Sequence, residues 1–104
     1  MDRAEKLHKL SLKAQSILPK DGEAWLFGSQ ARGTANSESD WDVLILLDKD
    51  KIALDDYDSY AYPFIELGWD IDATVIPILY TKLNWEKSSF TPFYKNVMND
   101  RIRL

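Results

Sequence analysis

The stretch that decides the fold is residues 27–48, which read FGSQARGTANSESDWDVLILLD. A short apolar run ends at Gly28 and Ser29, and a loop of small and polar residues follows. Asp40 and Asp42 then open a second apolar run, which is continuous and partly β-branched, as in a buried strand. The stretch therefore predicts a strand, a polar loop and a second strand, with polar side chains gathered where the loop meets the strands.

The two aspartates point to a metal ion. Successive side chains of a strand face opposite ways, so Asp40 and Asp42 should share one face, roughly 6.5–7 Å apart along the strand. Two neighbouring carboxylates repel each other unless they are protonated or bridged by a cation. Mg²⁺ prefers such hard oxygen ligands and usually takes one or two carboxylates together with water and substrate phosphates. The pair therefore predicts one half of a metal–nucleotide site.

Gly28 and Ser29 predict the other half, because a glycine lets the backbone come close to a ligand. Residues 29–32 can begin a helical turn, whose free amides attract phosphate with help from the Ser29 hydroxyl. Arg32 would add a charge-assisted contact, although a plain surface arginine is nearly as good an interpretation. A phosphate cradle beside a metal-binding pair implies chemistry on a nucleoside triphosphate.

This pattern resembles a known family. Gly28 and Ser29, ten intervening residues and then Asp40-Trp41-Asp42 resemble the signature of the DNA polymerase β-like nucleotidyltransferases. The string from 28 to 33 is similar to that of the minimal nucleotidyltransferases, which are single small domains of bacteria and archaea. The resemblance implies an α/β (α+β) fold in which a small mixed sheet packs against helices. It also implies transfer of a nucleoside monophosphate to a hydroxyl with two divalent ions, Mg²⁺ or alternatively Mn²⁺.

The resemblance further implies roles for individual residues. Asp40 and Asp42 would bind both metal ions, and Gly28 and Ser29 would hold the β- and γ-phosphates. Many minimal members are encoded beside a helical HEPN-type toxin and neutralise it by adenylylating a tyrosine. ATP is therefore the expected substrate, and such a toxin is the expected partner. The alternative is a protein that keeps the fold, has little or no activity, and neutralises a partner by occlusion.

The family also needs a third carboxylate on a strand beside the aspartate pair, and Asp72 is the best candidate. Residues 71–80 are expected to form that strand, with Asp72 and Thr74 on the same face. In that position Asp72 would complete the metal site nearest the attacking hydroxyl. If the apolar run of residues 75–79 is instead the one that aligns with the family, Thr74 or Ile76 occupies the carboxylate's place. Asp72 would then only cap the strand.

Composition limits the other functions. The chain has 104 residues, which fit one domain spanning 1–104, and a net charge of −4, which argues against a role in non-specific nucleic-acid or anionic-membrane binding. It has no cysteine and therefore no disulfide, which fits a reducing cytoplasm, and no apolar run long enough to span a membrane. So short a chain offers no evident acceptor pocket. A partner is expected to supply it, in a homo- or hetero-oligomer.

The remaining pattern predicts the elements around this centre. Trp41 should point away from the aspartate face into the core, and Pro77 should place the third strand at a sheet edge or a bulge. Pro63 should kink or divide a helix over residues 52–67, and Gly68 should end it. The other expected elements are a helix over 2–18, a strand over 23–27, a helix capped by Thr81 and a helix starting at Pro92.

Overall fold

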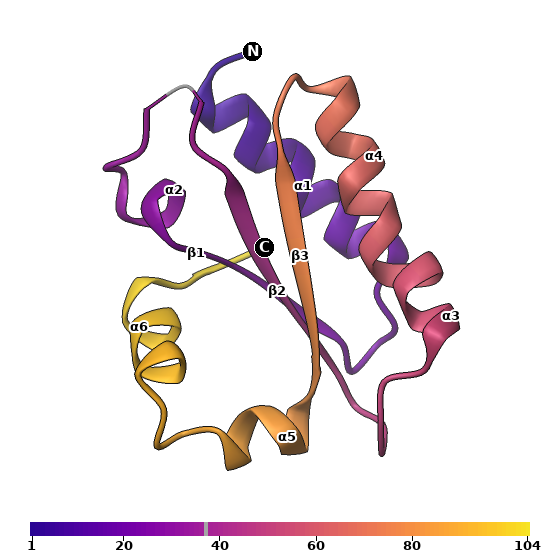
Figure 1. Cartoon of the computed structure of the whole chain (residues 1–104). Helices are drawn as coiled ribbons and strands as arrows, with labels where there is room; N and C mark the ends of the chain where they lie inside the picture. Colours follow the sequence, from indigo (N-terminus) through magenta and orange to yellow (C-terminus); the bar gives the residue numbers. More distant parts are fainter. Residues whose placement is uncertain (37) are drawn as a thin grey trace.

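The computed structural model describes residues 1–36 and 38–104 (Figure 1). The helices and strands alternate along most of the chain. In order, they are α1 (Arg3–Ile17), β1 (Glu23–Phe27), α2 (Ser29–Arg32), β2 (Trp41–Leu47), α3 (Leu54–Asp56), the π-helical turn η1 (Tyr57–Ala61), α4 (Tyr62–Asp70), β3 (Val75–Thr81), α5 (Lys82–Lys87), α6 (Pro92–Asp100) and β4 (Ile102–Arg103). None of the described helices is both long and apolar enough to cross a bilayer.

The strands form one mixed sheet in the order β3-β2-β1-β4. β1 runs antiparallel to β2 and β4, whereas β2 and β3 are parallel. Helices α1 and α4 cover one face, and α5 and α6 cover the other (Figure 1). The expected small mixed sheet packed against helices is confirmed. Pro77 lies on the edge strand β3, as predicted. Proline is tolerated there because an edge strand has a neighbour on one side only.

The sheet separates two apolar layers because β2 alternates between them. Trp41, Val43 and Ile45 point toward α1 and α4, where Leu10 and Phe64 are fully buried. The burial of Trp41 confirms the prediction that it points into the core. The other face of β2 begins with Asp42 and continues with leucines that pack against α5 and α6. The aspartate face is therefore the α5–α6 face.

The segment before β3 differs from the prediction. α4 continues through Gly68 to Asp70, and β3 begins only at Val75, so the expected strand over 71–80 was wrong in its first half. Gly68 does not end the helix: it is buried, and a Cβ there would lie 2.5 Å from the Ala73 carbonyl oxygen. Ala73 in turn donates a backbone hydrogen bond to the Gly68 carbonyl at 2.8 Å. The glycine serves close packing of the turn against the helix.

Asp72 lies in this turn with φ of 54°, outside the strand. The prediction that Asp72 and Thr74 share a strand face is therefore wrong. The π-helical turn η1, rather than a simple kink at Pro63, divides the preceding helix. Pro63 stands in the first turn of α4, where a missing N–H is tolerated.

The start of α3 depends on Asp56, whose buried carboxylate accepts hydrogen bonds from the Ala53 N–H and from Lys49 Nζ, both at 2.7 Å. The hydrogen bond from Lys49, followed by that from Ala53, lowers the pKa of Asp56. Asp56→Ala should therefore lower the free energy of unfolding by about 1–2 kcal/mol at pH 7 in urea titrations. The stabilisation should be lost as the pH falls through the lowered pKa. Asp55→Ala, at an exposed neighbour, should change little, and equal losses in both variants would contradict this assignment.

Candidate active site

The sheet brings the two predicted halves of the site together. Phe27 pairs with Asp42 across β1 and β2, and Asp42 pairs with Ile76 across β2 and β3, so these three side chains form a row on one face. Gly28 directly follows Phe27, and a Cβ on Gly28 would lie 2.5 Å from Asp42 Oδ2. The carboxylate thus packs against the bare Cα of Gly28. Ser29 comes next and begins α2.

The backbone at this point requires glycine. Gly28 has φ of 78° and ψ of −160°, a combination that residues with a side chain essentially never adopt. Its carbonyl oxygen accepts hydrogen bonds from the backbone N–H groups of Ala31 and Arg32, both at 3.1 Å, which closes the turn of α2. The chain therefore turns sharply at the end of β1 and places α2 beside the start of β2.

Two side chains that the sequence did not single out hold this loop in place. Gln30 is buried, and its Nε2 donates to the Ser39 carbonyl oxygen at 3.2 Å, which ties the turn to the segment before β2. Arg3 of α1 donates to the Gln30 carbonyl oxygen at 2.6 and 3.2 Å. Gln30 belongs to the motif string, but no local pattern marks it as buried. The contact to Arg3 spans 27 residues and leaves no sequence signal.

The electrostatics of the aspartate pair fit a cation. Burial of Asp42 raises its pKa, and the charge of Asp40 raises it further. The apolar neighbours Phe27 and Ile76 cause this burial, because they remove water from either side of the carboxylate. A divalent cation would offset both the desolvation and the repulsion. The donor set of two carboxylates is one that Mg²⁺ accepts when phosphates and water complete its shell.

This arrangement predicts that the Asp42 carboxylate destabilises the folded protein when no cation is bound. Because its pKa is raised in the folded protein, the ionised carboxylate disfavours folding at pH 7. Asp42→Asn should therefore raise the melting temperature at pH 7 without divalent ions. The gain should shrink as the pH falls through the raised pKa and vanish below the ordinary value of 3.8. Added Mg²⁺ should stabilise only the wild type. A variant less stable than the wild type in chelator at pH 7 would contradict this account.

The residue of β3 that pairs with Asp42 is apolar. Ile76 stands opposite Asp42, and its side chain is 39% exposed on the aspartate face. One step earlier, the Trp41 N–H donates to the Thr74 carbonyl oxygen at 2.8 Å, which fixes this parallel register. Asp72 is exposed in the preceding turn, where its backbone carbonyl accepts a hydrogen bond from Lys6 Nζ at 3.2 Å. Within residues 1–36 and 38–104, no three acidic, histidine or cysteine side chains form a metal-binding group.

Arg32 lies at the end of α2 and forms an ion pair with Asp100 at the end of α6, with 2.6 Å between Arg32 Nη1 and Asp100 Oδ2. Its side chain is 48% exposed. The Asp100 contact engages one terminal nitrogen of a guanidinium that carries five N–H donors, so a phosphate contact does not require Arg32 to leave Asp100.

Comparison with known proteins agrees with this geometry. The family model for the nucleotidyltransferase domain matches residues 7–104. No curated protein sequence matches the chain significantly. The fold is similar to that of a chain in a toxin–antitoxin complex with AMP-PNP, with a TM-score of 0.64, 21% identity, and coverage of 92% of this chain and 69% of that one.

The fold is also similar to that of a chain in the structure of the tri-AMPylated HEPN toxin of Shewanella oneidensis in complex with MNT antitoxin. There the TM-score is 0.62 at 17% identity, covering 98% of this chain and 71% of that one. At these identities the structural likeness establishes the fold, and the match of the family model over nearly the whole chain establishes the family. The chain belongs to the nucleotidyltransferase domain family.

Proposed function

We propose that this domain transfers AMP from ATP to a hydroxyl of a partner protein, namely a tyrosine of a HEPN-type toxin, and so acts as an antitoxin. The observation that carries the proposal is the contact between Asp42 and Gly28, with the charge of Asp40 beside it. The carboxylates proposed to bind metal and the turn proposed to bind phosphate are adjacent there. Two similar structures support the choice of substrate and partner. One is a toxin–antitoxin complex with AMP-PNP, and the other contains an AMPylated HEPN toxin with an MNT antitoxin.

The residues take the following roles in this proposal. Two Mg²⁺ ions, when bound with ATP, would neutralise the triphosphate and polarise the reacting phosphoryl group. Asp40 and Asp42 hold the metal ions, and Asp42 is held in place by its packing against the turn at Gly28. The backbone of that turn and the Ser29 hydroxyl would bind the β- and γ-phosphates, which leave as pyrophosphate when the α-phosphate is transferred to the hydroxyl oxygen.

Two further residues complete the proposed reaction. Arg32 adds a phosphate contact through N–H groups other than the one that binds Asp100. Asp72 is assigned to the second metal ion and to the proton of the attacking hydroxyl, and the reaction requires the turn that carries it to approach the aspartate pair. The partner supplies the hydroxyl and the remaining wall of the cleft.

A second candidate function is neutralisation of the partner by occlusion without AMP transfer. The specific observation that favours it is the register of β3, which places Ile76, rather than a carboxylate, opposite Asp42. Transfer needs a base and a metal ligand near the attacking hydroxyl, whereas nucleotide binding needs only the Asp40–Asp42 half of the site.

Transfer of radiolabel tests the two functions directly. The domain is incubated with α-labelled ATP, Mg²⁺ and the product of the adjoining gene, if that gene encodes a small helical protein with an Arg-x4-6-His motif. The wild type should label the partner, and both Asp42→Asn and Asp72→Asn should lose the label. Asp48→Asn is the matched control, because Asp48 is an exposed aspartate at the other end of the same strand. Neutralisation without label, equally by Asp42→Asn, would replace the transfer proposal with occlusion.

A further inference from the structure

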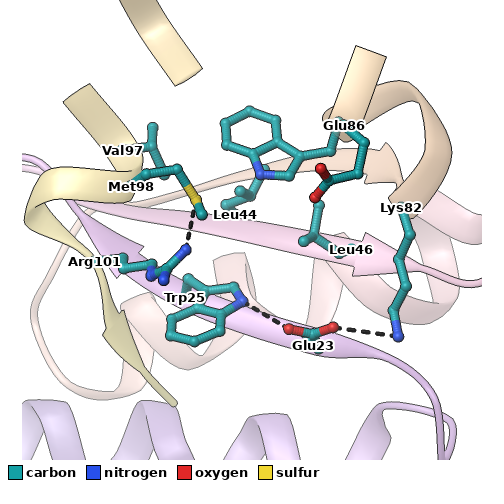
Figure 2. Close-up of a pocket in the computed structure, with 10 residues that line it drawn as sticks. Glu23, Trp25, Leu44, Leu46, Lys82, Glu86, Val97, Met98 and Arg101 are labelled. Carbon is teal, nitrogen blue, oxygen red and sulfur yellow. Dashed lines mark hydrogen bonds and ion pairs between the residues drawn. The ribbon is translucent and has the colours of Figure 1, made fainter. Parts of the chain in front are cut away.

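A cavity lies between the sheet and helices α5 and α6, with a volume of about 260 Å³ (Figure 2). We call it the α5–α6 pocket. Six apolar side chains line most of it: Trp25, Leu44 and Leu46 from the sheet, Trp85 from α5, and Val97 and Met98 from α6. The pocket is partly open to solvent, and the buried side chains of Leu44, Trp85 and Val97 form its floor. The pocket therefore has the form of a binding site for a small apolar group.

The α5–α6 pocket is separate from the nucleotide site, although both lie on the same face of the sheet. None of the residues assigned to ATP or metal ions lines it. An aromatic row lies between them: the ring of Phe93 meets Phe27 edge-on at 5.6 Å and Trp85 at 5.8 Å. Phe27 is the residue that stands directly opposite Asp42. A ligand in the pocket would therefore be screened from the aspartate pair.

One of the acidic residues of the pocket is already neutralised. Glu23 accepts a hydrogen bond from Trp25 Nε1 at 3.1 Å and forms ion pairs with Lys82 at 3.2 Å and Arg103 at 3.4 Å. Glu86, the other acidic residue, is exposed on α5, where water solvates its carboxylate. The interior of the pocket consequently carries little negative charge.

Arg101 is the cation that remains for a ligand. Its guanidinium lies 4.9 Å from the centre of the Trp25 ring and donates to the sulfur of Met98, as Figure 2 shows. A thioether is a weak acceptor, and an aromatic face offers no lone pair in a matching geometry. In the part of the chain that the structure describes, no carboxylate forms an ion pair with Arg101. The guanidinium is thus held at the rim of the pocket by two weak partners, and because Arg101 is exposed, its other N–H groups bind water that an anion can replace.

We infer that the α5–α6 pocket binds a small aromatic carboxylate, whose ring enters between Trp25 and Trp85 and whose carboxylate pairs with Arg101. The volume lies below the ~300–1,000 Å³ of sites for drug-sized molecules, which limits the ligand to one compact ring system. A guanidinium binds a carboxylate through two parallel hydrogen bonds, which gives both affinity and orientation. The two indole rings and the apolar floor provide the remaining contact area.

The test is a titration of the whole chain with indole-3-acetate, followed by ¹H–¹⁵N NMR, with uncharged 3-methylindole as the comparison compound. Indole-3-acetate should shift the indole N–H signals of Trp25 and Trp85 and bind roughly tenfold more tightly than 3-methylindole. Arg101→Gln should remove most of that difference.

Arg103→Gln is the matched control. Arg103 also lies over the Trp25 ring, at 5.0 Å, but it does not line the pocket. This variant should keep most of the preference for the anion, because Lys82 still pairs with Glu23. The inference is overturned if the two tryptophan signals do not move, if both compounds bind equally, or if Arg103→Gln lowers the affinity as much as Arg101→Gln does.

Discussion

Gly28→Ala is expected to reduce the affinity for ATP and Mg²⁺ by at least roughly 100-fold and to lower the free energy of unfolding by about 1–3 kcal/mol. Two effects combine at this position. The backbone conformation of Gly28 excludes a side chain, and the added methyl group would meet Asp42 Oδ2 at 2.5 Å. The carboxylate would therefore move away from the turn that is proposed to bind phosphate. Calorimetric titration and urea unfolding measure the two losses.

Gly33→Ala separates backbone strain from the clash with Asp42. Gly33 also has a positive φ, 76°, but a Cβ there would meet no atom within 4 Å. The substitution should cost about 1–2 kcal/mol of stability and leave binding of ATP and Mg²⁺ intact. If both alanine variants lose binding to the same degree, strain in the loop, rather than the Gly28–Asp42 contact, determines the site. If Gly28→Ala binds like the wild type, the contact has no functional role.

Ile76→Asp is expected to raise the affinity for Mg²⁺ by about tenfold, since it places a third carboxylate opposite Asp42 on the same face of the sheet. Ile76 is already partly exposed, so the charge need not be buried fully. The apparent affinity can be measured by calorimetry with Mg²⁺ alone.

Ile76→Asn is the control for this gain, because an asparagine side chain has nearly the shape of aspartate but carries no charge. It should bind Mg²⁺ no better than the wild type. Equal affinities of the aspartate and asparagine variants would mean that residue 76 does not reach the metal site.

The fold was predictable where short-range pattern decides the structure. The apolar runs that precede Gly28 and Asp48 predicted both central strands, because burial on a sheet needs continuous apolar residues. Thr81 caps α5 as predicted, with its hydroxyl accepting from the Asn84 N–H at 3.0 Å. Pro92 begins α6, also as predicted. Each of these signals is complete within a few residues.

The failures have a common cause in contacts that no local pattern records. Residues 71–74 alternate as a strand would, yet they form a turn because Gly68 lets the Ala73 carbonyl pack against α4. That packing removes Asp72 from the strand. The pairing of Arg32 with Asp100 likewise joins residues 68 positions apart. The local pattern therefore predicted that Gly28 lies near the aspartate pair. It did not predict the positions of Asp72 and Arg32 around that pair.

Titration of ATP with Mg²⁺ into the wild type, Asp42→Asn and Asp48→Asn, followed by calorimetry, tests the central claim most directly. The claim is that Gly28 and Asp42 form one metal–nucleotide site, which requires the carboxylate at position 42 and not the one at position 48. The account predicts binding by the wild type and by Asp48→Asn, and none by Asp42→Asn. Absence of binding by the wild type, or equal binding by all three proteins, would contradict it.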